Sequence, residues 1–217
     1  MYDINHISMQ EWADLVKEYA NFNPQSIMDI GAMDGADTET LELNFKTGNV
    51  YIIEPHPILH SLICKNRPSF KSFNLAASNI TSELEFNIVS TANSNLGISS
   101  LYDRTDNCSW AKPSQFEKIL VKSMRMDEFM EAQLIDTIDL LKIDVEGHSF
   151  EVLQGFGERL TSIKCIHIEN EHTEVWKNQK LYPEVEPILV NSGFVMLSIK
   201  VGWPQTDSIW IQKNCLK

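Results

Sequence analysis

The sequence is poor in cysteine and in basic residues, and each shortage excludes a class of protein. Its four cysteines are scattered, with no Cys-x-x-Cys pair and no histidine at zinc-ligand spacing, so neither a disulfide framework nor a structural zinc site is indicated. Eighteen Lys and Arg stand against 30 Asp and Glu, which gives a net charge of -12. A surface this acidic repels phosphate backbones and anionic lipids, so we expect neither nucleic acid nor membrane as a partner.

Long hydrophobic runs and targeting segments are absent as well. No stretch of about 18 apolar residues occurs, as a membrane-spanning helix would need. The first residues lack the basic start and apolar core of a signal peptide, so we expect a cytoplasmic protein with reduced thiols. The 217 residues, 43% of them hydrophobic, are enough for one core. No repeat or linker divides residues 1–217, so we expect a single domain.

Segments typical of strands alternate with segments typical of helices along most of the chain. Such alternation indicates βαβ units, which build a parallel sheet covered by helices on both faces. The first helix, within residues 1–23, has capping-box spacing at Ser8 and Glu11. We expect strands at 26–30, 49–53, 71–75, 83–89, 138–143, 164–168, 194–199 and 208–211, and helices at 9–20, 37–45, 58–66, 150–156 and 182–191.

The alternation stops between residues 90 and 117. This segment is rich in Ser, Asn, Thr and Asp and contains Trp110 and Pro113. An irregular segment of this length inside a compact domain is usually functional or disordered. We therefore expect a lid or substrate-facing loop at 90–117, with a passive excursion as the alternative.

The end of the first expected strand carries the motif Asp-x-Gly-x-x-x-Gly, formed by Asp29, Gly31 and Gly35. A strand-to-helix turn at this place is the usual ligand crevice of a doubly wound sheet. Gly31 would let a ligand approach the backbone, and Gly35 would ease close packing at the helix start. The spacing is not that of the dinucleotide fingerprint, and no Walker loop occurs. An ordinary glycine-containing turn is the alternative.

Polar and small residues end the next two expected strands. Glu54, followed by Pro55, stands where a carboxylate can accept both hydroxyls of a ribose, although a solvent-facing charge would have the same pattern. After the third strand, Asn74 and Ala76 would leave room for a flat adenine and offer hydrogen bonds to its edge. A ribose site without a pyrophosphate cradle favours S-adenosylmethionine over a nicotinamide dinucleotide.

The segment 140–155 is the most distinctive part of the sequence. An apolar strand contains Lys142 and then delivers Asp144, Glu146 and His148 to its carboxyl end. Several charges that leave water together must pair with one another or hold a ligand. A salt bridge from Lys142 to Asp144 or Glu146 is the structural alternative to ligand binding.

Four motifs resemble the FkbM methyltransferase family over residues 26–212: the glycine motif, Glu54-Pro55, Met126-Asp127-Glu128-Phe129 and Lys142-Ile143-Asp144-Val145-Glu146-Gly147. The resemblance implies the Rossmann-like, doubly wound α/β fold of class I methyltransferases, with a sheet of seven strands, six parallel and one antiparallel near the C-terminus. It also implies S-adenosylmethionine as cofactor and O-methylation of a hydroxyl on a small-molecule acceptor, a sugar, glycoside or other small metabolite. The implied cofactor residues are Asp29, Gly31, Ala32, Gly35, Glu54, Pro55, Asn74, Ala76 and Asp144, the last holding the α-ammonium group.

Methyl transfer to a hydroxyl needs a base for the departing proton. An imidazole, with an ordinary pKa of about 6.5, is suited to this role. His172, just after the fifth parallel strand, is the first candidate, His148 is the second, and Asp144 lies at the same edge of the sheet. A structural role is the alternative for each histidine.

A metal ion could replace the base by polarising the acceptor hydroxyl. Alternation along the fifth parallel strand would place His167, Glu169 and Glu171 on one face. Hard cations favour carboxylate oxygen, so Mg²⁺ or Mn²⁺ is the ion to expect if there is one. The candidate metal ligands are Asp144, Glu169, Glu171 and His172.

Three further hypotheses stay open at the level of sequence. A nicotinamide-dependent oxidoreductase is disfavoured by the missing fingerprint and by the lack of a convincing Tyr-x-x-x-Lys pair. A non-catalytic protein that binds the cofactor would keep the same binding motifs, and an N-methyltransferase would differ only in its acceptor. Aromatic residues that could line the acceptor pocket, or pack in the core, are Trp110, Phe116, Trp176 and Tyr182.

Overall fold

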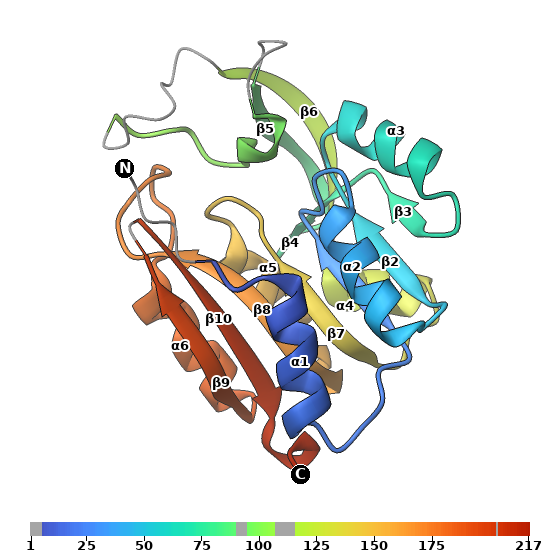
Figure 1. Ribbon diagram of the computed structural model, residues 1–217. Coiled ribbons are helices and arrows are strands. Elements are labelled where there is room, and N and C mark those ends of the chain that lie inside the picture. The colour runs from blue at the N-terminus through green and yellow to red at the C-terminus, as the bar shows by residue number, and fades with distance from the viewer. Residues whose placement is uncertain (1–5, 90–94, 107–115, 203) are drawn as a thin grey trace.

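The computed structural model describes residues 6–89, 95–106, 116–202 and 204–217 (Figure 1). None of the described helices combines the length and apolar character needed to cross a bilayer. In chain order the elements are α1 (Met9–Tyr19), β1 (Ile27–Ile30), α2 (Ala36–Phe45), β2 (Val50–Ile53), α3 (Pro57–Asn66), β3 (Lys71–Phe73), β4 (Ala76–Ser78), β5 (Ser82–Val89), η1 (Leu96–Ile98), β6 (Phe116–Arg125), α4 (Met126–Ala132), β7 (Ile138–Ile143), α5 (Ser149–Phe156), η3 (Gly157–Ser162), β8 (Ile163–Glu171), α6 (Tyr182–Asn191), β9 (Phe194–Val201), β10 (Gln205–Gln212) and η4 (Lys213–Cys215).

The large sheet has seven strands in the order β3-β2-β1-β7-β8-β10-β9. Strand β1 pairs in parallel with β2 and β7, while β10 runs antiparallel to both β8 and β9. Six strands therefore share one direction and one opposes them, which confirms the predicted doubly wound fold. The strand order reverses beside β1, so the ligand crevice of this fold is expected at the carboxyl ends of β1 and β7.

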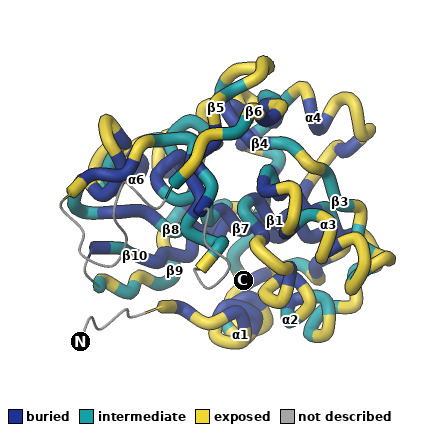
Figure 2. Tube along the Cα trace, turned by 90° about the horizontal axis from the view of Figure 1, so that it is seen from above, coloured by how far each residue is buried: buried dark blue, intermediate teal, exposed yellow. Residues whose placement is uncertain are grey.

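Helices cover both faces of the large sheet. On one face, α1, α2 and α3 bury Trp12, Leu41 and Ile63 against the strands, and on the other α4, α5 and α6 form the larger core cluster. All six residues of β7 are buried, because a strand covered on both faces has no wet side. In Figure 2 exposed positions recur along the outer elements, α1, α2, α3 and α6 among them, while β1 and β7 at the centre are buried.

The first helix begins with the capping box that the sequence predicts. The Ser8 hydroxyl accepts from the backbone N–H of Glu11 at 3.2 Å, and the Glu11 carboxylate accepts from the backbone N–H of Ser8 at 2.8 Å. The helix packs on the face of the sheet, where the Trp12 indole N–H lies 3.2 Å from the Cys165 sulfur. Just before α1, the backbone N–H of Ile7 donates to Asp207 of β10 at 2.7 Å, near the carboxyl end of β8.

A second sheet of three strands, in the order β4-β6-β5, projects above the large sheet in Figure 1. Strand β5 was expected. The loop predicted at 90–117 was wrong at its last two residues, Phe116 and Glu117, which begin strand β6. No strand was expected at 118–125, the rest of β6. There β6 pairs with β5 over eight residues. Helix α4 follows directly, and it was not expected either. Strand β6 was missed because much of it is exposed, and charged side chains on its outer face interrupt the apolar pattern by which a strand is recognised.

Candidate active site

A cavity of about 520 Å³ lies between the two sheets, at the carboxyl ends of β1, β2 and β7. Its walls come from these strand ends, from β4 and β5 of the small sheet, and from residues 95–101. A volume of this size suits a small-molecule ligand. The cavity therefore occupies the crevice that the strand order predicts.

The turn after β1 has no room for a side chain at Gly31. This residue lines the cavity with a φ of +81°, and a Cβ there would lie 1.8 Å from the backbone oxygen of Asp144. The close approach arises because the backbone N–H of Asp144 donates to the carbonyl of Ile30 at 3.0 Å, which ties the ends of β1 and β7 together. Gly31 is required by this backbone contact, and its bare surface also faces the cavity.

Glu54 closes the wall at the end of β2. Its carboxylate accepts one hydrogen bond from the backbone N–H of Met33 at 2.9 Å and another from that of His56 at 2.8 Å. The side chain is only 4% exposed, and this burial raises the pKa of Glu54 to about 7. Met33 has a left-handed φ of 52°, a strained conformation that aims its N–H at the carboxylate. The turn after β1 and the end of β2 are thus built around this one carboxylate.

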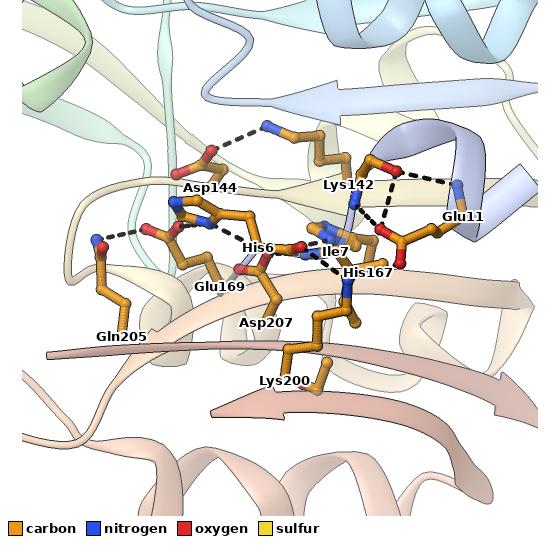
Figure 3. Close-up of polar contacts among 12 residues, drawn as sticks. His6, Ile7, Glu11, Lys142, Asp144, His167, Glu169, Lys200, Gln205 and Asp207 are labelled. Carbon is orange, nitrogen blue, oxygen red and sulfur yellow. Dashed lines mark hydrogen bonds and ion pairs between the residues drawn. The ribbon is translucent and has the colours of Figure 1, made fainter. Parts of the chain in front are cut away.

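Lys142 joins the carboxylates behind the cavity. Its ammonium lies 3.0 Å from Asp144 (Figure 3). It also lies 3.4 Å from Asp37 and 3.9 Å from Asp29, and its side chain is 4% exposed. The predicted bridge from Lys142 to Asp144 is confirmed. Asp29 is completely buried and accepts from the Thr38 hydroxyl, and burial raises its pKa to about 6. Lys142 holds Asp144 at the cavity wall.

The structure divides the predicted cofactor residues into two groups. One group lines the cavity, and the other lies behind its wall. Asn74 belongs to the group behind the wall, and its amide donates to the backbone oxygens of Glu54 and Pro55 at 2.9 and 3.0 Å. Contact between either group and a cofactor stays a prediction. Those that line the cavity are Gly31, Glu54, Pro55, Ala76 and Asp144, and those behind it are Asp29, Ala32, Gly35 and Asn74.

The two candidate histidine bases lie in different places. His172 is outside the cavity, in contact with Thr206 and with the Tyr182 ring, so the structure does not bring the first candidate to the site. His148 lines the cavity, with its Nε2 3.1 Å from the Ser78 hydroxyl. Burial lowers the pKa of His148 to about 4, so this imidazole is neutral and weakly basic at pH 7.

Glu146 is a cavity residue that was not among the predicted site residues. Burial raises its pKa well above the ordinary value, with Asp144 adding to the effect, and within the described part of the chain its Oε2 has no hydrogen-bond partner. Its φ of 49° is left-handed, and Gly147 follows at 92°. A carboxylate three residues beyond a strand and directly before a glycine was the available signal, because such a pair marks a sharp turn into the crevice.

The predicted metal ligands do not form a site. All four are described, yet no three of them bring ligand atoms within 4.8 Å of one another. Glu171 instead accepts from the Gln179 amide at 2.8 Å, and Glu169 meets His6 and Asp207. Sequence reasoning missed the latter two because they lie far from Glu169 in the chain.

The aromatic acceptor pocket is not supported. Trp176 is completely buried beside Val175 and packs edge-on against Phe116, and neither ring lines the cavity, nor does that of Tyr182. Trp110 lies outside the described residues. Apolar lining comes instead from the segment expected to be a lid, where Leu96, Ile98 and others between residues 95 and 101 face the cavity. Residues 90–94 and 107–115 of that segment are outside the described residues.

Part of this chain is similar to a curated methyltransferase. The chain is 34% identical to the methyltransferase sdnD of Sordaria araneosa over 71 residues, which are 33% of this chain and 26% of that protein.

Solved structures share the fold at low identity. The methyltransferase FkbM of Methylobacillus flagellatus has a TM-score of 0.54 and 14% identity, over 87% of this chain and 44% of its own. TrmK of M. capricolum, in complex with S-adenosylhomocysteine, has a TM-score of 0.51 and 13% identity, over 94% and 67%. Magnesium protoporphyrin IX methyltransferase of Synechocystis, with bound S-adenosylmethionine, has a TM-score of 0.50 and 11% identity, over 94% and 78%. This chain therefore spans less than half the length of both sdnD and the Methylobacillus protein.

The domain comparison identifies the family. The methyltransferase FkbM domain matches residues 29–196, from the glycine motif to β9. The match includes the carboxyl end of β1 and the whole of β2 and β7, and the motif residues of the cavity wall follow these strands. The chain belongs to the FkbM methyltransferase family and has the fold of class I methyltransferases.

Proposed function

We propose that this chain binds S-adenosylmethionine and transfers its methyl group to a hydroxyl of a sugar or another small metabolite. The observation that carries the proposal is the buried Glu54 carboxylate at the end of β2, which lines the cavity beside the bare turn at Gly31. A carboxylate in this place can accept both hydroxyls of a ribose. Family membership supports methyl transfer, and the cavity supports a small acceptor.

The cavity residues fit the cofactor chemically. Ala76, Ala77 and Leu59 give an apolar wall next to Glu54, as a flat adenine requires. Asp144, held by Lys142, offers a carboxylate that can hold an ammonium group. The cofactor supplies, when bound, an electrophilic methyl group on a positively charged sulfur.

The charge of the site also suits this cofactor. Asp144, Glu146 and Glu169 all line the cavity, and burial raises the pKa of Glu146 and Glu169 well above the ordinary value. A buried group of carboxylates is stabilised by a cation placed among them. The small sheet and residues 95–101 form part of the cavity wall, and such a wall would limit the access of water to the methyl group of a bound cofactor.

Glu146 replaces the histidines as the proposed proton acceptor. It faces the cavity and has an oxygen without a partner, whereas His172 is outside and His148 has a pKa of about 4. A carboxylate whose pKa is raised by burial holds a proton more strongly than an exposed one, which favours proton transfer from a hydroxyl. The proposed role of Glu146 is to take the acceptor proton as the methyl group moves.

Glu146→Gln should lower kcat about 100- to 10,000-fold, because the amide cannot accept the proton. Since the reaction needs ionised Glu146, the wild-type rate should rise with pH through the raised pKa, and the variant should lose this rise. Binding of S-adenosylhomocysteine should change by no more than about threefold. If His172→Ala abolishes turnover while Glu146→Gln retains it, the assignment of the base to Glu146 is wrong.

The cofactor proposal is tested by isothermal titration of the purified protein with S-adenosylhomocysteine and, separately, with NADH. We expect a dissociation constant of about 1 μM for S-adenosylhomocysteine and no heat with NADH. Screening of sugars and glycosides with radiolabelled cofactor would then identify the acceptor. Binding of NADH alone would replace the methyltransferase proposal with the oxidoreductase, and tight cofactor binding without any acceptor would favour the non-catalytic protein.

A further inference from the structure

Three residues from distant parts of the chain meet at the rim of the cavity. His6 precedes α1, Glu169 is in β8, and Asp207 is in β10 (Figure 3). The His6 Nδ1 lies 3.2 Å from Asp207 Oδ2 and 3.7 Å from Glu169 Oε2, and one ligand atom of each residue lies within 4.8 Å of the others. Glu169 and Asp207 are paired across the antiparallel strands β8 and β10, so the sheet itself sets the two carboxylates side by side.

The carboxylates of this cluster are held in place by other groups. The Gln205 amide donates to Glu169 Oε1 at 2.7 Å, which leaves Oε2 toward His6. The backbone N–H of Ile7 donates to Asp207 Oδ2 at 2.7 Å. Metal-binding carboxylates and imidazoles are oriented by partners of this kind.

His167 provides a second and independent sign of a ligand. It is 3% exposed, and neither of its ring nitrogens has a hydrogen-bond partner among the residues that the structure describes. Its Nε2 points to Asp207, 3.9 Å from the same Oδ2 that faces His6. A buried polar ring without a hydrogen-bond partner needs an explanation. With a metal ion bound at Asp207, the His167 ring would either bind the ion or orient Asp207 as its ligand.

The surrounding charge favours a cation. Glu169 has the carboxylates of Asp144, Glu146, Asp207 and Glu171 as its neighbours, so several negative charges surround the cluster. Lys142 is already shared among three other carboxylates. The nearby Lys200 ammonium lies 2.6 Å from the Glu11 carboxylate and donates to the backbone carbonyl of His6 at 3.1 Å, so its charge is paired with Glu11.

We propose that His6, Glu169 and Asp207 bind one divalent transition metal ion, Zn²⁺ or Mn²⁺, at the rim of the cavity. One imidazole nitrogen with two carboxylate oxygens favours these ions over Mg²⁺ and Ca²⁺, which prefer oxygen alone. Three protein ligands leave coordination positions open, and both His6 and Glu169 line the cavity. The ion would also tie the segment before α1 to β8 and β10. The site stands independently of the proposed methyl transfer.

The test is titration of the metal-free full chain with ZnCl₂, MnCl₂ and MgCl₂, without cofactor. We expect one ion per chain and affinity in the order Zn²⁺, Mn²⁺, Mg²⁺. His6→Ala should weaken Zn²⁺ and Mn²⁺ binding about 100-fold, because it removes the nitrogen ligand. His6 is half exposed and precedes the first helix, so this variant is expected to fold.

A matched control distinguishes this site from a surface histidine. His60 on α3 lies 3.7 Å from the Cys64 sulfur and could bind Zn²⁺ adventitiously. His60→Ala should leave the stoichiometric Mn²⁺ site intact, and the Mn²⁺ electron paramagnetic resonance spectrum should change with His6→Ala only. Absence of stoichiometric binding, or its loss in His60→Ala with retention in His6→Ala, would overturn the proposal. Failure of the cofactor proposal would show separately, in the S-adenosylhomocysteine titration.

Discussion

Lys142→Met should lower the free energy of unfolding by about 3–5 kcal/mol at pH 7. The substitution keeps the apolar stem of the side chain and removes a buried ammonium that lies within 4.0 Å of three carboxylates. Of these, Asp29 has no exposed surface and would keep only the Thr38 hydroxyl as a partner. Removing one partner of a buried pair costs more than the pair contributes, because the remaining charge is left in a medium of low polarity.

The pH dependence of this loss follows from Asp29. Burial raises the folded-state pKa of Asp29 to about 6 from 3.8, and Lys142 opposes that rise. In the variant the folded-state pKa of Asp29 should rise further. The stability lost is therefore smaller below pH 6, where Asp29 is protonated in the folded wild type as well as in the folded variant. Urea unfolding of wild type and variant at pH 5 and pH 8 should therefore show the larger difference at pH 8.

Two controls separate a buried charge from a general loss of lysine. Lys118 also contacts two carboxylates, Glu85 and Asp103, at 2.9 and 3.2 Å, but on the surface of β6. Lys118→Met should leave the unfolding midpoint almost unchanged, since exposed pairs contribute little. The double variant Asp29→Asn, Lys142→Met should lose about 1–3 kcal/mol less free energy of unfolding than the sum of the two single losses. Equal losses in the two lysine variants would contradict the role given to Lys142.

The fold was predictable where the pattern of burial repeats locally. Strand β7 and helix α6 have the predicted bounds, because an apolar run and a helix with Pro183 in its first turn are decided within a few residues. The small sheet was not predictable in the same way. Strand β6 buries only Val121 and Ser123, so its sequence has little of the apolar alternation of a strand. Its pairing with β5 joins residues on either side of segment 90–115, and no local pattern in the sequence indicates it.

The site was predictable as far as strand ends define it. Glu54 and Asp144 reach the cavity because parallel strands bring their carboxyl ends to one edge, which follows from topology alone. His172 was misplaced because its backbone N–H donates to the Pro204 carbonyl at 2.9 Å, which continues the pairing with β10 and takes its side chain to Thr206. His6 was missed because only the packing of α1 on the sheet brings the N-terminal segment to the rim.

Glu54→Gln should weaken binding of S-adenosylhomocysteine about 100-fold, which corresponds to about 2.7 kcal/mol. The wild-type carboxylate can accept ribose hydroxyls in addition to the two backbone N–H groups that already orient it. The amide has one acceptor oxygen and an NH₂ group that would face one of those N–H donors. Isothermal titration at pH 8 measures the loss, and an unchanged affinity would contradict the ribose role.

The raised pKa of Glu54 adds a signature that a purely structural defect would not give. Its folded-state pKa is about 7 against an ordinary value of 4.5, so the stability it contributes is complete below pH 4.5 and is lost as the pH rises through 7. The difference in pKa corresponds to about 3 kcal/mol, and Glu54→Gln should not show this loss. Relative to wild type, the variant without ligand should therefore gain stability between pH 5 and pH 8. Over the same range wild-type affinity for S-adenosylhomocysteine should rise more steeply with pH than that of the variant, because only the ionised carboxylate accepts from both hydroxyls.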